Sequence, residues 1–331
     1  MKTSLRLGID LGGTKIELIA LDASGQTLLS RRVATPQNDY AATVSTLTKL
    51  VLEAESTLGQ IGTVGIGTPG AISPATGLMK NCNSTCLNGH PLNDDIARAL
   101  NRDIRMANDA NCFALSEATD GAAAGAEVVF GVIIGTGVGG GIVVRGQVLN
   151  GANAIAGEWG HSPLPYFQFA HSQADRESTG AHPATGEGLV HPWPNEREGQ
   201  GTACYCGKKG CVETWLSGAA LVADHIRYGG EELPAPVIAQ RAATGDGACS
   251  KTLARYEERL ARGLAGVINL LDPDVIVLGG GLSNIARLYD TVPRLWPRYV
   301  FSDHIATRLV APKFGDASGV RGAAWLWNAS A

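Results

Sequence analysis

Three cysteines within one short loop constrain this chain more than any other feature of its sequence. Cys204, Cys206 and Cys211 are separated by one and by four residues, with glycines between the second and the third. A structural Zn²⁺ ion takes four N or S ligands in a tetrahedron, and such a loop can aim three sulfurs at one point. His161, which ends a compact Gly-Glu-Trp-Gly-His cluster, is the candidate fourth ligand. The sequence therefore predicts a zinc knuckle whose metal holds shape and does no chemistry.

A disulfide with one spare thiol is the weaker alternative. A Cys-x-Cys pair is awkwardly close for bridging, and the first four residues run straight into a strand pattern with no secretion signal. Glu158 and Glu213 lie next to the predicted ligands in sequence. A metal at this position would fix two carboxylates beside a histidine, so we expect a rigid polar pocket there.

Length and charge exclude several classes of function. A chain of 331 residues suggests about two domains. Its net charge of −4 provides no basic field for nucleic acid or a membrane surface. No apolar run approaches the roughly 20 residues of a spanning helix. We therefore expect a cytoplasmic protein with reduced thiols and a small-molecule partner.

Two glycine-rich turns lie between strand patterns, about 120 residues apart. Gly12-Gly13-Thr14 follows a strand that ends at Asp10, and a glycine run beginning Gly135-Thr136-Gly137 precedes a strand at 142–144. Backbone N–H groups of such turns can meet phosphate oxygens, and Asp10 could hold Mg²⁺ through water; a plain hairpin is an equal alternative. Because both copies continue into a strand and a Gly-Gln pair, we predict a duplication, with two related domains facing each other across a cleft.

Two further strand ends carry candidate ligand groups. A strand at 104–107 ends at Asn108 and Asp109, where a helix begins that runs to about residue 118. Open α/β sheets bind ligands at such a place, although helix capping alone is favoured for a lone Asp. A fully apolar strand at 275–278 leads into three glycines and a predicted helix from about Ser283, so its N–H groups could meet a nucleotide. Cys82 and Cys86 are expected to be two ordinary thiols.

Taken together, these motifs resemble the ROK family of bacterial sugar kinases and repressors, over nearly the whole chain. The resemblance implies an α/β fold of two actin-like, ribonuclease-H-like ATPase domains around a central cleft, with the small zinc knuckle. The N-terminal domain would span 1–118 and be joined by a C-terminal helix at 317–331. The second domain would span 119–316 and carry an insertion at about 166–203. The amino-acid sequences of the motifs are most similar to those of the fructokinase and mannokinase branch.

The resemblance also implies roles for individual residues. Asp109 would be the general base, and the sugar would bind Gly70, Asn83, Asn108, Asp109, Glu158, His161 and Glu213. ATP would bind Asp10, Gly12, Gly13, Thr14, Lys15, Gly135, Thr136, Gly137, Gly279, Gly280 and Gly281. Zinc would be held by His161, Cys204, Cys206 and Cys211. One departure concerns the sugar site, because Cys86 stands where the family leads us to expect a tryptophan.

The implied function is an ATP- and Mg²⁺-dependent hexose kinase, with D-fructose converted to fructose 6-phosphate as the leading reaction. Mannose, glucose or an N-acetylhexosamine are alternative acceptors. A sugar-responsive repressor lacking its DNA-binding domain is an alternative of another class. It has little weight, because only nine residues precede Asp10 and the chain is acidic. A sugar-binding module without activity is a third. A homodimer is common among relatives.

Overall fold

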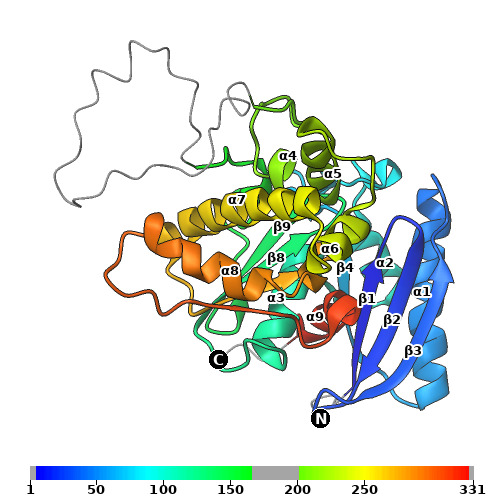
Figure 1. The fold of residues 1–331 in the computed structure, drawn as a ribbon. Coiled ribbons are helices and arrows are strands. Elements are labelled where there is room, and N and C mark those ends of the chain that lie inside the picture. Colours follow the sequence, from blue (N-terminus) through cyan, green and yellow to red (C-terminus); the bar gives the residue numbers. More distant parts are fainter. Residues whose placement is uncertain (1–4, 166–200, 328–331) are drawn as a thin grey trace.

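The computed structural model describes residues 5–165 and 201–327. Within these ranges the chain forms two five-stranded mixed sheets and one two-stranded sheet, with helices between and around them (Figure 1). The predicted α/β class is confirmed. The predicted insertion at about 166–203 lies outside the described residues as far as residue 200.

The two large sheets have the same strand order. The first runs β3-β2-β1-β4-β7 and the second β10-β9-β8-β11-β12. In each, three consecutive strands form an antiparallel meander and two later strands join it in parallel. This agreement supports the internal duplication predicted from the glycine turns. The strands are β1 (Arg6–Leu11), β2 (Lys15–Leu21), β3 (Thr27–Ala34), β4 (Thr63–Thr68), β7 (Arg105–Asn108), β8 (Val128–Ile134), β9 (Val138–Val144), β10 (Gln147–Val148), β11 (Val275–Gly279) and β12 (Arg308–Val310); β5 (Ala71–Ile72) and β6 (Met79–Lys80) form the small sheet.

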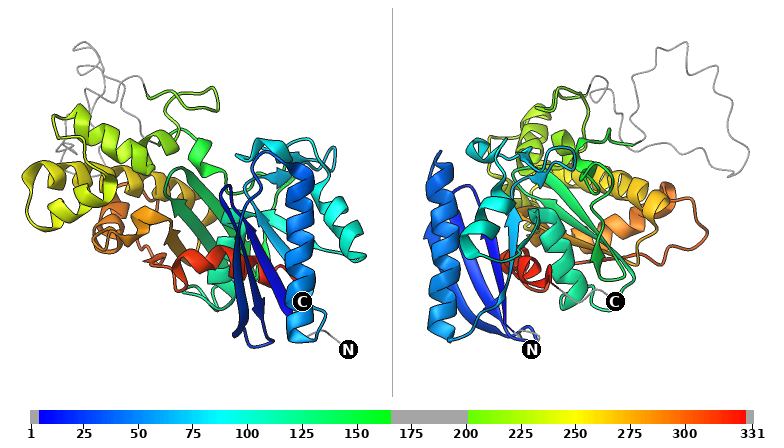
Figure 2. Two further views of the ribbon diagram at one scale, coloured as in Figure 1. Left: turned by 90° about the vertical axis from the view of Figure 1, so that its right-hand side faces the viewer. Right: turned by 180° about the vertical axis from the view of Figure 1, so that it is seen from behind.

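Alternating side chains divide the core into three parts. Even-numbered apolar residues of β8 and β11, such as Phe130 and Ile276, pack in one core with the long helix α7, whereas their neighbours Val129 and Val275 pack in a central core between the sheets. A third core lies between β1, β2 and α1. Figure 2 shows this layering from two sides. The α-helices are α1 (Tyr40–Leu58), α2 (Leu92–Leu100), α3 (Asp109–Thr119), α4 (Glu213–Leu216), α5 (Gly218–Arg227), α6 (Ala235–Ala243), α7 (Gly247–Leu271), α8 (Leu288–Leu295) and α9 (Ser318–Trp325).

Helices α3 and α9 fill the space between the two sheets, in contact with each other. A Cβ atom on Gly322 of α9 would overlap the backbone carbonyl of Cys112 in α3. A Cβ atom on Gly8 of β1 or on Gly65 of β4 would likewise overlap backbone atoms of α9. One on Gly141 of β9 would overlap backbone atoms of α3. The first sheet therefore packs on α9 and the second on α3. The predicted domain boundary at residues 118 and 119 falls at the end of α3 and stays a prediction.

The prediction that β9 starts at residue 142 was wrong. Gly139, Gly140 and Gly141 are strand residues, and β9 begins at Val138. Glycine lowers strand propensity, and we therefore extended the turn through this run. Here glycine is needed because other backbone approaches both faces: a Cβ on Gly140 would lie 2.8 Å from the carbonyl oxygen of Gly157, and one on Gly141 would overlap α3.

The helix predicted from Ser283 is also different. Gly281–Asn284 is a single 3-10 turn that ends where Ile285 adopts an extended backbone, and α8 begins only at Leu288. Buried Leu282 and Ile285 both pack in the core around α7. The strand and the three glycines are as predicted, but no full helix N-terminus follows them.

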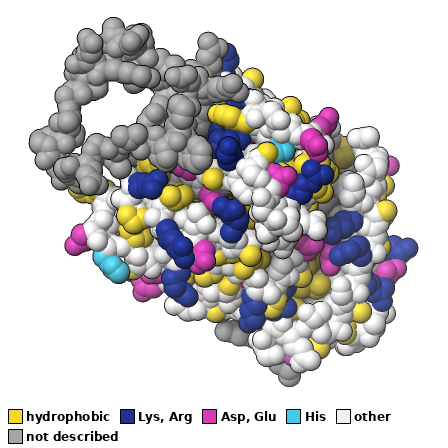
Figure 3. Space-filling model, in the orientation of Figure 1, with side chains coloured by type: hydrophobic (Ala, Val, Ile, Leu, Met, Phe, Trp, Pro, Cys, Tyr) yellow, Lys and Arg dark blue, Asp and Glu magenta, His cyan; other side chains and the backbone are white. Residues whose placement is uncertain are grey.

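Charged side chains are mixed on the visible surface. On the face shown in Figure 3, basic and acidic groups are interspersed rather than gathered by sign. In the described ranges, no helix combines the length and apolar character that crossing a membrane requires.

The contact between α3 and α9 can be tested with two glycines of the same helix. Gly322→Ala places a methyl group into the backbone of α3, and we expect it to lower the free energy of unfolding by about 3 kcal/mol or more. Gly319→Ala is the matched control, because open space surrounds a Cβ there. It should raise stability by up to about 1 kcal/mol. Urea unfolding followed by circular dichroism compares them; equal stability of the two variants would contradict the packing argument.

Candidate active site

Asp109 is the first residue of α3, at the end of β7. Asn108, and not Asp109, caps the helix: its side-chain oxygen accepts from the Asn111 N–H at 2.7 Å. Asp109 Oδ1 accepts only from the N–H of the next residue, at 2.8 Å. The capping role that the sequence favoured for Asp109 therefore belongs to its neighbour. One carboxylate oxygen of Asp109 is left for a ligand.

Asp109 and Asp10 form a pair of close acids. Solvent can reach the Asp109 side chain, but many protein atoms surround it. They displace much of the water around the carboxylate, and this desolvation raises the pKa of Asp109. Burial and the charges of Asp109 and Glu17 raise the pKa of Asp10 to about 6. Glu17 is the cross-strand neighbour of Asp10 in β2. Two desolvated acids at the ends of strands from one sheet suit a proton acceptor or a site for a hydrated cation.

The Gly-Glu-Trp-Gly-His segment is fixed on β9. Its Trp159 is 8% exposed, donates from Nε1 to the Gly139 carbonyl at 2.9 Å and meets Phe130 edge-on. A Cβ on Gly160 would overlap the Val138 carbonyl. The tryptophan thus anchors the segment, and the glycines let it lie directly on the strand. Glu158 and His161, on either side of this anchor, are held in place.

The predicted sugar-binding charges come together around Glu158. Burial is the main cause of its raised pKa; the charges of Asp109 and Glu213 raise that pKa further, while His161 and Lys80 lower it. The charges of Asp109 and His161 therefore both act on Glu158, and the sugar-binding roles expected of these residues stay predictions. Lys80 was not predicted; it donates to the Asn153 carbonyl at 2.8 Å and joins β6 to the loop before Glu158.

Glu213 has a partner that the sequence did not indicate. Its Oε2 accepts from the Val138 N–H at 3.0 Å, and a Cβ on Gly137 would lie 2.7 Å from the same oxygen. One carboxylate oxygen therefore fixes the second glycine turn. The predicted contact of Glu213 with sugar would use the other oxygen.

The four predicted metal ligands converge. Their donor atoms all lie within 4.8 Å of one another in the described part of the chain. Cys206 Sγ is 3.6 Å from Cys211 Sγ, and Cys204 Sγ is 3.6 Å from His161 Nδ1. Ligands around zinc with bonds of about 2.3 Å would be about 3.8 Å apart, so the spacing fits zinc. A disulfide does not fit, because all three are free thiols.

The electrostatics of the cluster also fit a cation. The Lys208 N–H lowers the pKa of Cys206, whereas burial and hydrogen bonds with the neighbouring sulfurs raise the pKa of Cys211 to about 12. Three thiolates this close repel one another, and a divalent metal removes that repulsion. Cys82 and Cys86 belong to no such cluster among the described residues.

The outer nitrogen of His161 already has a partner. Nε2 lies 2.9 Å from the Tyr205 hydroxyl, and the two rings meet edge-on with centroids 5.1 Å apart. The sequence prediction reserved this nitrogen for a sugar hydroxyl. Tyr205 stands between Cys204 and Cys206 in the sequence, but the spacing of the cysteines does not predict where the tyrosine side chain lies.

The first glycine turn is held by its carbonyl groups. Thr35 donates to the Gly12 carbonyl at 2.7 Å, and Gln37 donates to the Gly13 carbonyl at 2.9 Å. Sequence reasoning missed both. Lys15, which we predicted at the nucleotide, lies 3.9 Å from Glu17. Gly13 and Thr14 line a cavity of about 250 Å³ together with Asn83 to Leu87, so predicted nucleotide and sugar groups are adjacent here.

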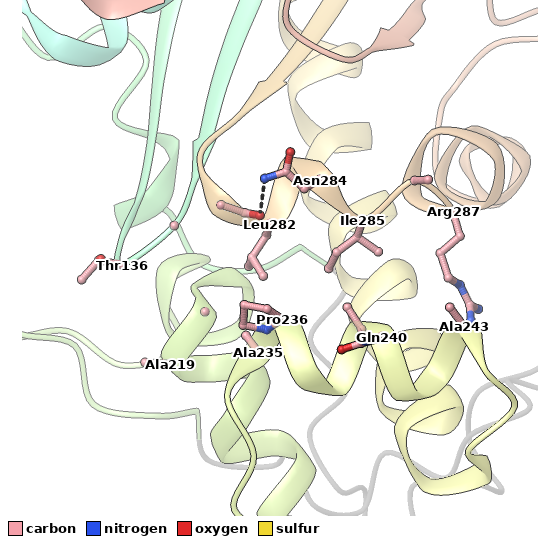
Figure 4. A pocket seen from close by; sticks show the side chains of 15 residues that line it. Thr136, Ala219, Ala235, Pro236, Gln240, Ala243, Leu282, Asn284, Ile285 and Arg287 are labelled. Atoms are coloured by element: carbon pink, nitrogen blue, oxygen red, sulfur yellow. Dashed lines mark hydrogen bonds between the residues drawn. The ribbon is translucent and has the colours of Figure 1, made fainter. Parts of the chain in front are cut away.

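The second turn lines a much larger cavity, of about 1160 Å³. Figure 4 shows Leu282 and Ile285 facing Pro236 and the rest of α6 across it. Gly135, Thr136 and Gly281 of the predicted nucleotide residues line it. Gly280 lies against the end of β8 with a φ of 79°, which glycine adopts without strain. Gly279 lies against Phe113 of α3 instead.

One wall of this cavity was missed. Helix α6 contributes Ala235, Pro236, Ala239, Gln240 and Ala243, and the sequence analysis assigned no element to this stretch. A proline at the second position of the helix and two apolar residues four positions apart, Ile238 and Ala242, are the sequence signals from which this helix could have been predicted.

Comparison with known proteins identifies the family. The ROK family profile matches residues 6–330. The chain belongs to the ROK family. The N-acetyl-D-glucosamine kinase of Photobacterium profundum is 38% identical over 320 residues, which cover 96% of this chain and 98% of that protein. The resemblance inferred from the motifs is therefore confirmed.

Solved structures of ROK proteins share the fold. The ROK hexokinase of Thermus thermophilus matches with a TM-score of 0.77 and 28% identity, covering 97% of both chains. A ROK glucokinase of Streptomyces griseus, in complex with glucose and AMPPNP, matches with a TM-score of 0.70 and 25% identity over 97% of this chain and 98% of that one. Sugar phosphotransfer is the activity these relatives share. None of these relatives is named a fructokinase, so the expected fructokinase is not supported, and the relative from Photobacterium profundum matches the alternative of an N-acetylhexosamine kinase.

The raised pKa of Asp10 predicts a pH-dependent stability difference. Because its pKa is higher in the folded chain than in the unfolded one, Asp10 destabilises the fold as pH rises from about 4 to about 6. Without added Mg²⁺, Asp10→Asn should therefore be more stable than the unchanged chain at pH 7, by roughly 1–3 kcal/mol. Most of this difference should vanish at pH 4. Urea unfolding at both pH values measures it, and a difference independent of pH would contradict the prediction.

Proposed function

We propose that this chain is an ATP-dependent N-acetyl-D-glucosamine kinase. The observation that carries the proposal is the meeting of Asp109, Glu158 and His161 at one place, in a chain that is 38% identical to an enzyme of that name. A base next to several hydrogen-bonding groups suits an acceptor with many hydroxyls. The large cavity beside the second glycine turn suits the nucleotide.

Asp109 is proposed as the general base. A sugar hydroxyl is a poor nucleophile, and a carboxylate within hydrogen-bond reach can take its proton as the new bond to phosphorus forms. Burial raises the pKa of Asp109, which strengthens it as a base. Its Oδ1 accepts from the Ala110 N–H, and the side-chain hydrogen bonds of the described residues leave Oδ2 available to a hydroxyl. Asn108 keeps its amide N–H₂ group for an acceptor hydroxyl, because only its oxygen is used in capping.

The nucleotide is proposed to bind across both glycine turns. The apolar walls formed by Pro236, Ala239 and Ile285 suit the adenine base, and Gly135 and Thr136 lie at the end of the same cavity. The glucokinase of Streptomyces griseus was solved with an ATP analogue, AMPPNP. The first turn lines a separate cavity, so the phosphates must extend beyond the larger one to reach it. Mg²⁺, which Asp10 and Asp109 suit, would neutralise phosphate charge in this transfer.

Zinc is proposed to have a structural role only. His161, Cys204, Cys206 and Cys211 use all four tetrahedral positions, so no open position remains for a reactant. The metal would fix His161 beside Glu158. Glu213 follows Cys211 by two residues and accepts a hydrogen bond from Val138, so the metal would also help to fix the second glycine turn.

A coupled assay of ADP release over a panel of sugars tests the function. N-acetyl-D-glucosamine should give the highest kcat/KM, ahead of glucose, mannose and fructose. Asp109→Asn should lower kcat by about 10²–10⁴ and leave the fold intact, because it removes the base and keeps the shape. Asp94→Asn, at an exposed acid of α2, is the control. Preference for fructose would restore the first expectation, and sugar binding without turnover in the unchanged chain would favour a regulator.

The metal has its own test. Cys206→Ser removes one ligand, and we expect bound zinc to fall from about one ion per chain to well below that. Stability should fall with it. Cys86→Ser changes a thiol outside the cluster and should keep full zinc content. Metal analysis by plasma emission, together with thermal unfolding, measures both; unchanged zinc in Cys206→Ser would rule out the knuckle.

A further inference from the structure

Tyr205 lies at the edge of the proposed acceptor site without a structural reason to be there. Its side chain is 80% exposed, although tyrosine is a large and partly apolar residue. Its one side-chain hydrogen bond in the described structure joins the hydroxyl to His161 Nε2, at 2.9 Å. The ring therefore projects from the knuckle into solvent, while its hydroxyl turns back toward the site.

The knuckle fixes the backbone on both sides of this tyrosine. The Cys204 N–H donates to the Lys208 carbonyl at 2.8 Å, and the Gly207 N–H donates to the Cys204 carbonyl at 3.0 Å. Ala203 pairs with Lys209 in a β-bridge. The cysteines before and after Tyr205 point to one metal position. The Tyr205 side chain leaves the loop toward His161 and the solvent.

The acceptor site lies on that side. The Tyr205 hydroxyl is bonded to His161, and the His161 backbone N–H donates to the Glu158 carbonyl at 3.3 Å, so the phenol ring lies next to the segment that carries two of the predicted sugar ligands. The other groups gathered there are carboxylates, an imidazole and an ammonium group. Tyr205 adds a phenol ring to this group, together with a hydroxyl that can donate and accept.

This combination matches an acetamido group better than a hydroxyl. An acetamido substituent carries an apolar methyl group, an N–H donor and a carbonyl acceptor. A sugar hydroxyl has no apolar part and is served fully by the carboxylates of Glu158 and Glu213. The ring of a tyrosine can pack on the methyl group, and its hydroxyl can form a hydrogen bond with the amide.

We propose that Tyr205 contacts the acetamido group of the acceptor sugar and selects N-acetylhexosamines over unsubstituted hexoses. The ring packs on the methyl group, and the hydroxyl, oriented by His161, bonds the amide. His161 is then a positioning residue as well as a metal ligand. This inference rests on the proposed kinase function and deepens it.

The test compares two sugars in the unchanged chain and in three variants. Tyr205→Ala should lower kcat/KM for N-acetyl-D-glucosamine about tenfold or more through a higher KM, and change that for glucose by less than about threefold. Tyr205→Phe keeps the ring and should lose only part of the selectivity. Phe301→Ala, at another exposed aromatic residue, should change neither sugar. Bound zinc is measured in every protein and should stay the same.

Several results would overturn the inference. Equal loss for both sugars in Tyr205→Ala, or no change for either, means that Tyr205 does not select the acceptor. Loss of zinc in Tyr205→Ala means that its role is to stabilise the knuckle. Failure of the proposed function gives a different result, because the unchanged chain would then not phosphorylate N-acetyl-D-glucosamine at all. In that case Tyr205 could not contact an acetamido group of the acceptor.

Discussion

The backbone contact between α3 and α9 is the constraint on which the remaining structure depends. At Gly322 the two helices are so close that no side chain fits between them, and glycines in β1, β4 and β9 bring each sheet onto its helix in the same way. Such packing allows few alternative arrangements, because backbone atoms cannot change rotamer. Asp109 is the first residue of α3. The position of the proposed base is therefore set by the centre of the molecule rather than by a surface loop.

A second connection runs from the metal cluster to the nucleotide turn. Cys211 is two residues before Glu213, whose carboxylate holds the Val138 N–H at the start of β9. Trp159, two residues before His161, is bonded to the next residue of that strand, Gly139. Both sides of the knuckle therefore end on β9. A change at the cysteine cluster would therefore reach His161 and the second glycine turn together.

The sequence predicted elements whose signals are local. The strand ends at Asp10 and Asp109 and the convergence of Cys204, Cys206 and Cys211 depend on spacing within a few residues, and the structure has them close to where they were expected. The glycines of β9 were misread because what requires them is α3 and the Gly157 segment, which lie far away in sequence. Thr35 and Gln37 were missed for the same reason: their role is a contact with a turn more than twenty positions earlier.

Acceptor selectivity could not be read from the motifs because the motifs describe the frame of the site. Carboxylates and amides at fixed strand ends bind hydroxyl groups that most hexoses share. Discrimination must therefore come from side chains at the rim. Cys86 is one example, since a small thiol stands where a tryptophan was expected and lines the cavity beside Gly13 and Thr14. Tyr205 is proposed as another. Aromatic surface that is absent at Cys86 and present at Tyr205 would change which ring substituent meets an apolar wall, while the reacting hydroxyl stays at Asp109.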